Sequence, residues 1–250
     1  MNKNVACGLF GSALAFGLPF GDLAAEEGVE ADYGVSGRGN IGIYSKYVFR
    51  GLQQPNSETN GPALQGGFEL NHLSGAYAGY WGSNLDARQV GAKSGVENNV
   101  YAGYAGEVGE LEYAAGALYY KYISIDHADA PELFLDAAYG HFGVGMEYLA
   151  QDVEWGNAGD IYWTADFETE LPLEFGMQVE AGYYTYAESG KYVEHTEISN
   201  GFRNLNVSIT HPMGHSGAVM SLTGILGGVD REDRKQGSTA VLGVDYEFDI

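Results

Sequence analysis

Several residue types are scarce in this 250-residue sequence, and each scarcity excludes a class of protein. The one cysteine, Cys7, lies in an amino-terminal segment that we expect to be removed. The mature chain should therefore have no disulfide, thiolate metal site or cysteine nucleophile. No run of about 20 apolar residues follows that segment, which excludes a helical membrane protein.

Basic residues are also few, since 12 Lys and Arg stand against 34 Asp and Glu, for a formal net charge of −22. Nucleic acid binding needs a basic surface, so we expect no nucleic acid partner. A strongly acidic surface instead attracts cations over about a Debye length.

Residues 1–25 have the layout of a secretory signal peptide. Lys3 precedes an apolar stretch from Val5 to Phe20, and Ala25 offers a small residue at the expected cleavage point. The polar, acidic residues 26–39 are then expected to form a flexible periplasmic lead-in. The sequence therefore predicts export of a mature domain that spans residues 40–250.

The first segment of that domain, residues 40–52 (NIGIYSKYVFRGL), alternates between two kinds of side chain. One set is mostly apolar, and the other contains both Lys46 and Arg50. Alternation of period two indicates a β-strand with different environments on its two faces. The segment exceeds the ~5–6 residues typical of globular strands and is close to the roughly 9–11 that cross a bilayer.

Twelve such segments follow one another, and the connections between them are alternately long and short. The predicted strands are residues 40–52, 62–73, 76–86, 96–107, 110–123, 131–141, 142–151, 159–171, 174–187, 201–211, 217–227 and 237–250. Long loops that alternate with tight turns are typical of outer-membrane barrels, whose short turns are periplasmic. We therefore predict an all-β fold, a transmembrane antiparallel up-and-down β-barrel of about 12 strands and of outer-membrane type.

A secreted soluble β-protein would show the same alternation, so the positions of the aromatic residues serve as a second test. On the predicted outer face they form two bands, as expected at the two surfaces of a membrane. The band near the short turns contains Tyr77, Tyr139, Phe142, Phe175, Tyr246 and Phe248, and the band near the long loops contains Phe49, Tyr148, Trp163 and Tyr183. Small residues are expected on the inner face, among them Gly67, Gly82, Gly103 and Gly182.

Three stretches also resemble a known family, the TorF family of proteobacterial porins. They are SKYVFRGLQQ at residues 45–54, PALQGG at residues 62–67 and GAYAGYWGSN at residues 75–84. The resemblance implies an outer-membrane barrel and passive passage of solutes, and it supplies no substrate. The carboxyl-terminal alternation of Tyr246, Phe248 and Ile250 is typical of an outer-membrane assembly signal, although an aromatic residue is usual in place of Ile250.

Charged residues on the predicted inner face are the candidate site, as the lining of a pore. Two of them, Lys46 and Arg50, are basic, and the acidic ones are Glu69, Asp86, Glu97, Asp136, Glu147, Asp166, Glu168, Glu180, Asp245 and Glu247. A ring of carboxylates in a narrow lumen favours cations. Arg50 has two overlapping interpretations: an ion pair that braces the barrel, or a constriction residue that sets selectivity.

Other motifs are weaker. The glycines of residues 37–42 match a dinucleotide fingerprint but open no helix, and His211 and His215 lie in a turn, so we expect no cofactor and no metal centre. Acidic residues of the external loops could hold divalent cations between lipopolysaccharide phosphates, and two basic residues near the external rim could meet the same phosphates; these are Asp126, Asp129, Asp230 and Asp233, and Lys121 and Arg203.

The leading hypothesis is a non-enzymatic porin of the cell outer membrane that passes small solutes or ions. Its other expected partners are outer-membrane lipids and lipopolysaccharide. One alternative is a non-conducting barrel with a structural or adhesion role. A second is an outer-membrane lipid hydrolase, but the chain has no G-x-S-x-G motif, and His211 has no obvious serine partner.

Overall fold

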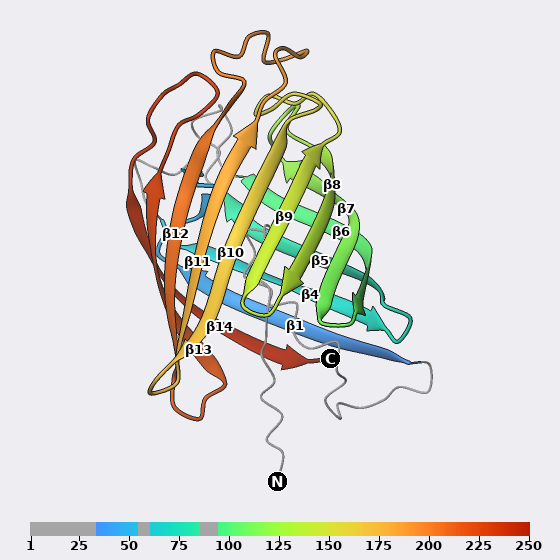
Figure 1. Ribbon diagram of the computed structural model, residues 1–250, viewed down its shortest axis with the longest axis vertical. Helices are drawn as coiled ribbons and strands as arrows, with labels where there is room; N and C mark the ends of the chain where they lie inside the picture. Colours follow the sequence, from blue (N-terminus) through green and yellow to red (C-terminus); the bar gives the residue numbers. More distant parts are fainter. Residues whose placement is uncertain (1–33, 55–60, 86–94) are drawn as a thin grey trace.

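The computed structural model describes residues 34–54, 61–85 and 95–250. Twelve antiparallel strands close into a barrel, in which each pairs with its neighbours in sequence and the first pairs with the last (Figure 1). They are β1 (Val35–Tyr44), β4 (Ala63–His72), β5 (Ala76–Leu85), β6 (Gly95–Val108), β7 (Leu111–Ile123), β8 (Ala130–Tyr139), β9 (Phe142–Leu149), β10 (Ile161–Leu171), β11 (Phe175–Thr185), β12 (Asn200–Pro212), β13 (Ala218–Gly227) and β14 (Thr239–Asp249). The predicted fold is confirmed.

Two further strands, β2 (Val48–Phe49) and β3 (Leu52–Gln53), pair only with each other. Within the described ranges, no helix is long and apolar enough to cross a membrane.

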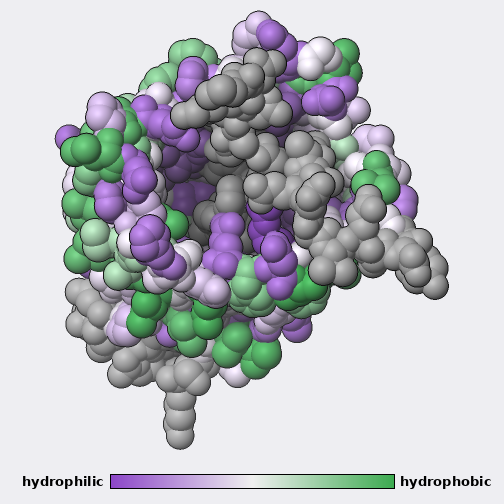
Figure 2. Space-filling model, turned by 90° about the horizontal axis from the view of Figure 1, so that it is seen from below, coloured by the Kyte–Doolittle hydropathy of each residue, from purple (hydrophilic) through white to green (hydrophobic). Residues whose placement is uncertain are grey.

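The outer face of the barrel is apolar and the inner face is polar or aromatic. On β8, Leu133 and Leu135 are about half exposed, whereas Glu132 and Phe134, which alternate with them, are buried. Seen from the short-turn end, hydrophobic residues cover the outside and hydrophilic ones surround a hollow (Figure 2). An apolar exterior around a polar interior is the arrangement that lipid requires of a barrel.

Most of the predicted outward aromatic residues are exposed, but two lie elsewhere. Tyr77 points inward and is 5% exposed. Its cross-strand partner on β6 is Gly103, which has no side chain, so the Tyr77 ring can lie over it. Phe49 belongs to the small hairpin and contacts the ring of Tyr120. Four glycines were predicted on the inner face, and for Gly82 this prediction is wrong. Gly82 faces outward, because it pairs with outward-facing Gly66.

The first strand differs most from its prediction. β1 begins at Val35, five residues before the expected start and within the predicted lead-in, and it ends at Tyr44. The chain then leaves the wall at Ser45 and folds back at a tight turn in which Arg50 and Gly51 both have positive φ, 47° and 73°. Two successive positive φ values are those of a type I′ hairpin turn. The alternation of residues 45–52 therefore belongs to a hairpin rather than to the barrel wall.

Candidate constriction inside the barrel

The hairpin of residues 45–54, called here the inward hairpin, is fixed at its base to the last strand. The backbone N–H of Ser45 donates to the carbonyl of Leu242 at 2.7 Å. The ammonium group of Lys46 lies 2.5 Å from the hydroxyl of Thr239 on the same strand. These contacts hold the start of the hairpin beside β14.

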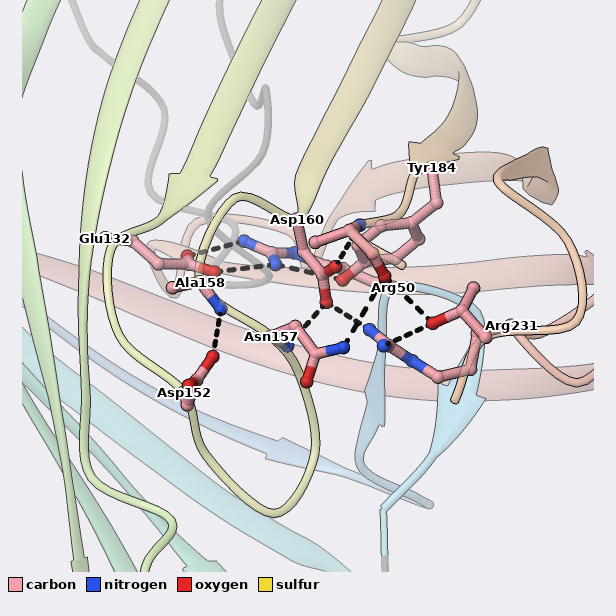
Figure 3. A network of polar contacts seen from close by, with 10 residues as sticks. Arg50, Glu132, Asp152, Asn157, Ala158, Asp160, Tyr184 and Arg231 are labelled. Carbon is pink, nitrogen blue, oxygen red and sulfur yellow. Dashed lines mark hydrogen bonds and ion pairs between the residues drawn. The ribbon is translucent and has the colours of Figure 1, made fainter. Parts of the chain in front are cut away.

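Arg50 at the turn of the inward hairpin reaches the opposite wall. Its two terminal nitrogens donate to the two carboxylate oxygens of Glu132 on β8 at 2.9 and 2.7 Å, and one also lies 3.1 Å from the Tyr184 hydroxyl (Figure 3). The rings of Phe49 and Tyr162 lie 4.7 and 4.8 Å from the guanidinium carbon. The side chains of Arg50 and Glu132 are only 4% and 1% exposed. This is a buried, bidentate ion pair of the kind for which arginine geometry is suited.

The turn also contacts β12. The Arg203 side chain donates through Nε to the carbonyl of Arg50 at 2.9 Å. A Cβ added to Gly51 would lie 2.7 Å from the Cβ of Asn204, so only glycine allows this approach. The inward hairpin therefore crosses the interior from β14 to β8 and β12.

Two more aromatic contacts fill the space beside the hairpin. The Tyr47 hydroxyl donates to Glu97 at 2.9 Å, and the Tyr47 ring lies 6.0 Å from that of Trp81. Phe49 meets Tyr120 edge to face, at the same separation. The hairpin thus narrows the interior with aromatic side chains as well as with its backbone.

All the predicted acidic residues that the structure describes lie on the inner face. Asp86 falls outside the described residues, and the strand registers place on the inside Glu69, Glu97, Asp136, Glu147, Asp166, Glu168, Glu180, Asp245 and Glu247. Several accept hydrogen bonds from neighbouring strands, for example Glu180 from Asn206 at 3.0 Å.

Two residues of the site were missed or misplaced by the sequence analysis. Glu132, the partner of Arg50, was not among the candidates. It nevertheless lies on the same face of β8 as Phe134 and the candidate Asp136, because the three residues are two positions apart. Arg203 was expected at the external rim, where phosphates could reach it. It is instead 3% exposed, because it turns inward to the hairpin and to the carbonyl of Val229.

The external loops are joined to one another above the hairpin. Asp160 accepts hydrogen bonds from the backbone of Asn157 and of Ala187, each at 2.9 Å, and forms an ion pair with Arg231 (Figure 3). Its two neighbouring loops, residues 186–199 and 228–238, are thereby held together. Arg203 extends this network down to Arg50.

The loop acids and histidines form no metal centre among the described residues. Asp129 accepts a hydrogen bond from Lys121, and Asp230 accepts four from its own loop. His72 lies 2.8 Å from the Ser74 hydroxyl, but both belong to one exposed turn. His211 contacts the ring of Phe175 at 4.5 Å.

The closed sheet, its apolar exterior and its polar interior define a twelve-stranded β-barrel of outer-membrane type. The chain belongs to the Gcw_chp family, described as a bacterial protein of unknown function, which matches residues 27–218. This match does not confirm the TorF family. Solved structures do confirm a likeness in fold to outer-membrane porins.

Two solved structures illustrate that likeness. The KdgM porin has a TM-score of 0.55 and 9% identity over 84% of this chain and 99% of its own. The COG4313 outer membrane channel from Pseudomonas putida F1 has a TM-score of 0.51 and 11% identity over 88% of this chain and 98% of its own. At such identities the likeness concerns the fold alone. No curated protein matches the sequence.

Proposed function

We propose that this protein is a non-enzymatic porin of the outer membrane, in which the inward hairpin forms the constriction and the acidic interior favours cations. The observation that carries the proposal is the hairpin itself, which crosses the barrel at the Arg50–Glu132 ion pair. A backbone segment that folds into the lumen of a barrel narrows the route that a solute would take. The carboxylates beside it supply the negative field that attracts cations.

The surroundings of such a barrel follow from its surface. The apolar belt fits the acyl chains of outer-membrane lipids, with exposed Tyr148, Trp163 and Tyr183 toward the long loops and Tyr139 and Phe142 toward the short turns. Asp126 and Asp233 in the external loops are exposed and could meet divalent cations at lipopolysaccharide. Residues 1–25 would direct export.

The test is conductance of the purified protein in planar bilayers, with reversal potentials measured across a salt gradient. We expect discrete channel currents and a reversal potential whose sign indicates preference for cations over anions. In the variant Arg50→Met, the loss of one positive charge at the constriction should increase the cation preference. Absence of conductance in every salt would reject the porin, and anion preference would reject the role of the carboxylates.

A second candidate, a non-conducting barrel with a structural or adhesion role, has one observation in its favour. The external loops are tied by Asp160 and Arg231 into a fixed surface, which suits contact with a partner. Replacement of residues 228–238 by a short glycine-containing turn separates the two. If the barrel serves adhesion, this replacement should abolish cell adhesion. If the barrel is a porin, conductance should persist after the replacement.

A further inference from the structure

Interior carboxylates on four successive strands form a row on the short-turn side of the Arg50–Glu132 ion pair. This acidic row consists of Asp136 on β8, Glu147 on β9, Asp166 on β10 and Glu180 on β11. Adjacent strands lie about 4.8 Å apart, so the row extends roughly 14 Å around the wall. It belongs to one continuous sheet with unbroken register.

Two members of the acidic row are buried without hydrogen-bond partners. Glu147 is 2% exposed and Asp166 is 5% exposed, and both oxygens of each carboxylate have no donor among the described residues. Buried polar groups are nearly always hydrogen-bonded, and a buried carboxylate accepts only. These four oxygens therefore call for a donor that the chain does not provide.

The arrangement of the charges leads to the same conclusion. Asp166 lies directly opposite Glu180 in the β10–β11 register, and like charges in that position destabilise a sheet. Thr164, which lies between the levels of Glu147 and Asp166, also has a buried hydroxyl without a partner. A cation that contacted several of these groups would relieve both the repulsion and the missing hydrogen bonds.

The spread of the row decides the class of cation. Among the described residues, no three acidic or histidine side chains are close enough together to hold one metal ion. A linear polyamine carries ammonium groups separated by methylene segments, so it can donate to carboxylates on successive strands. The rings that flank Glu147 across its neighbouring strands, Phe134 and Tyr162, would contact the methylenes and add cation–π attraction.

One position in the row carries no side chain. Gly145 stands between Asp136 and Thr164 in the register, and therefore leaves no side chain between them. At Gly143 the corresponding place is taken by Asp166 itself, whose two carboxylate oxygens would be 2.6 Å from an added Cβ. A ligand along the row would therefore approach the backbone at Gly145.

We propose that the acidic row is a binding subsite for linear polyamines, which are then the substrate class of this channel. The inference rests on the proposed porin function for transport, but binding at the row does not require conduction. It uses Glu147 and Asp166 as the principal acceptors and Asp136 and Glu180 at the two ends.

The probe is spermidine, and the variants are Glu147→Gln combined with Asp166→Asn. Calorimetry on the folded barrel in detergent should show that the double variant binds spermidine about tenfold or more weakly, since a hydrogen bond to a charged group contributes at least that factor. In bilayers, spermidine should block the sodium current of the wild type, and the block should weaken by the same factor. Heat-dependent gel migration verifies that both proteins are folded.

Asp245→Asn is the matched control, because Asp245 is an interior carboxylate on β14 that already accepts a hydrogen bond from Tyr44. It should leave spermidine affinity within about twofold, a difference well below that of one charged hydrogen bond. Binding without conductance supports the subsite and rejects the porin. Conductance without spermidine binding, or equal block by calcium and by spermidine, overturns the subsite and keeps the porin.

Discussion

The interior of the barrel has two walls of different character. The packed wall, formed by β5 to β10, carries large side chains that are almost completely buried, among them Trp81, Leu118, Tyr120, Phe134 and Tyr162. The polar wall, formed by β12 to β14, carries small side chains that are partly exposed, namely Ser208, Thr210, Ser221 and Thr223. The aromatic side chains of the inward hairpin pack on the first wall, where Tyr47 contacts Trp81 and Phe49 contacts Tyr120.

The difference between the walls separates two tasks that one closed sheet must perform. Aromatic contacts and the Arg50–Glu132 pair fix the hairpin on the packed wall. Hydroxyl groups on the polar wall, such as the Ser208–Thr223 pair at 2.8 Å, can exchange hydrogen bonds with water without loss of packing. Stability and permeability are therefore expected to respond to substitutions on opposite sides of the lumen.

The substitution with the largest expected effect on stability removes the ion pair between the inward hairpin and the packed wall. Arg50→Met leaves the Glu132 carboxylate buried without a counter-ion and with only the Tyr120 hydroxyl donating to it, which should cost about 3–5 kcal/mol of unfolding free energy. Urea unfolding followed by tryptophan fluorescence measures the loss. The double variant with Glu132→Leu should regain most of it, since no charge then remains buried. A single variant within about 1 kcal/mol of the wild type would mean that the pair is hydrated.

The next effect compares the walls directly. Leu118→Ala removes a side chain that is 2% exposed and should cost about 2–5 kcal/mol through the cavity that it leaves. Thr223→Ala on the polar wall loses one hydroxyl contact and should cost about 1 kcal/mol or less. Both are measured by the same urea titration. Equal losses would show that the two walls are packed alike.

A third substitution tests the close approach of the hairpin turn to β12. Gly51→Ala places a methyl group against Asn204 at a positive φ and should cost about 2–3 kcal/mol, together with unstable channel currents. Gly109→Ala is the control, because Gly109 has nearly the same φ and nothing within 4 Å of an added Cβ. It should cost about 1–2 kcal/mol, from the backbone alone. Identical losses would remove the role assigned to Asn204.

The smallest effect lies outside both walls, at the external loop of residues 228–238. Partial burial alone would raise the pKa of Asp230, but hydrogen bonds from Arg234 and Glu232 outweigh it and lower that pKa below its usual value. Its stabilisation is therefore present above the ordinary Asp pKa and lost as the pH falls through the lowered one. Asp230→Asn should destabilise by less than about 1 kcal/mol near pH 6, and the difference should vanish near pH 2. Thermal unfolding at both pH values tests this, and a constant difference would exclude titration of Asp230.

Much of the wall could be predicted from the sequence because its side chains alternate over lengths that no other local structure shares. On β10, exposed Trp163 and buried Tyr162, Thr164 and Asp166 follow the predicted faces. Tyr77 did not, since nothing local to it reveals that Gly103 lies across the strand pair. Such cross-strand vacancies become visible only when the register is known.

The inward hairpin could not be predicted, because its two short strands continue the alternation of β1. The one local sign is the Arg50–Gly51 pair, but Asn or Asp usually precedes glycine in a type I′ turn. The partners of Arg50 are far away in sequence, at 82 residues for Glu132 and 153 for Arg203. Glu132 itself was accessible to sequence reasoning, as a period-two neighbour of Phe134.

The same long separations give the inward hairpin a place in the order of assembly. Its base rests on β14 and its turn rests on β8 and β12, so the docked hairpin requires strands from the middle and the end of the chain. Before the seam between β1 and β14 forms, no completed lumen exists in which Arg50 could be shielded from water. Contacts of such high sequence separation are formed late in folding. Docking of the hairpin therefore reports that the barrel has closed, and an insertion intermediate would have a wider interior than the finished protein.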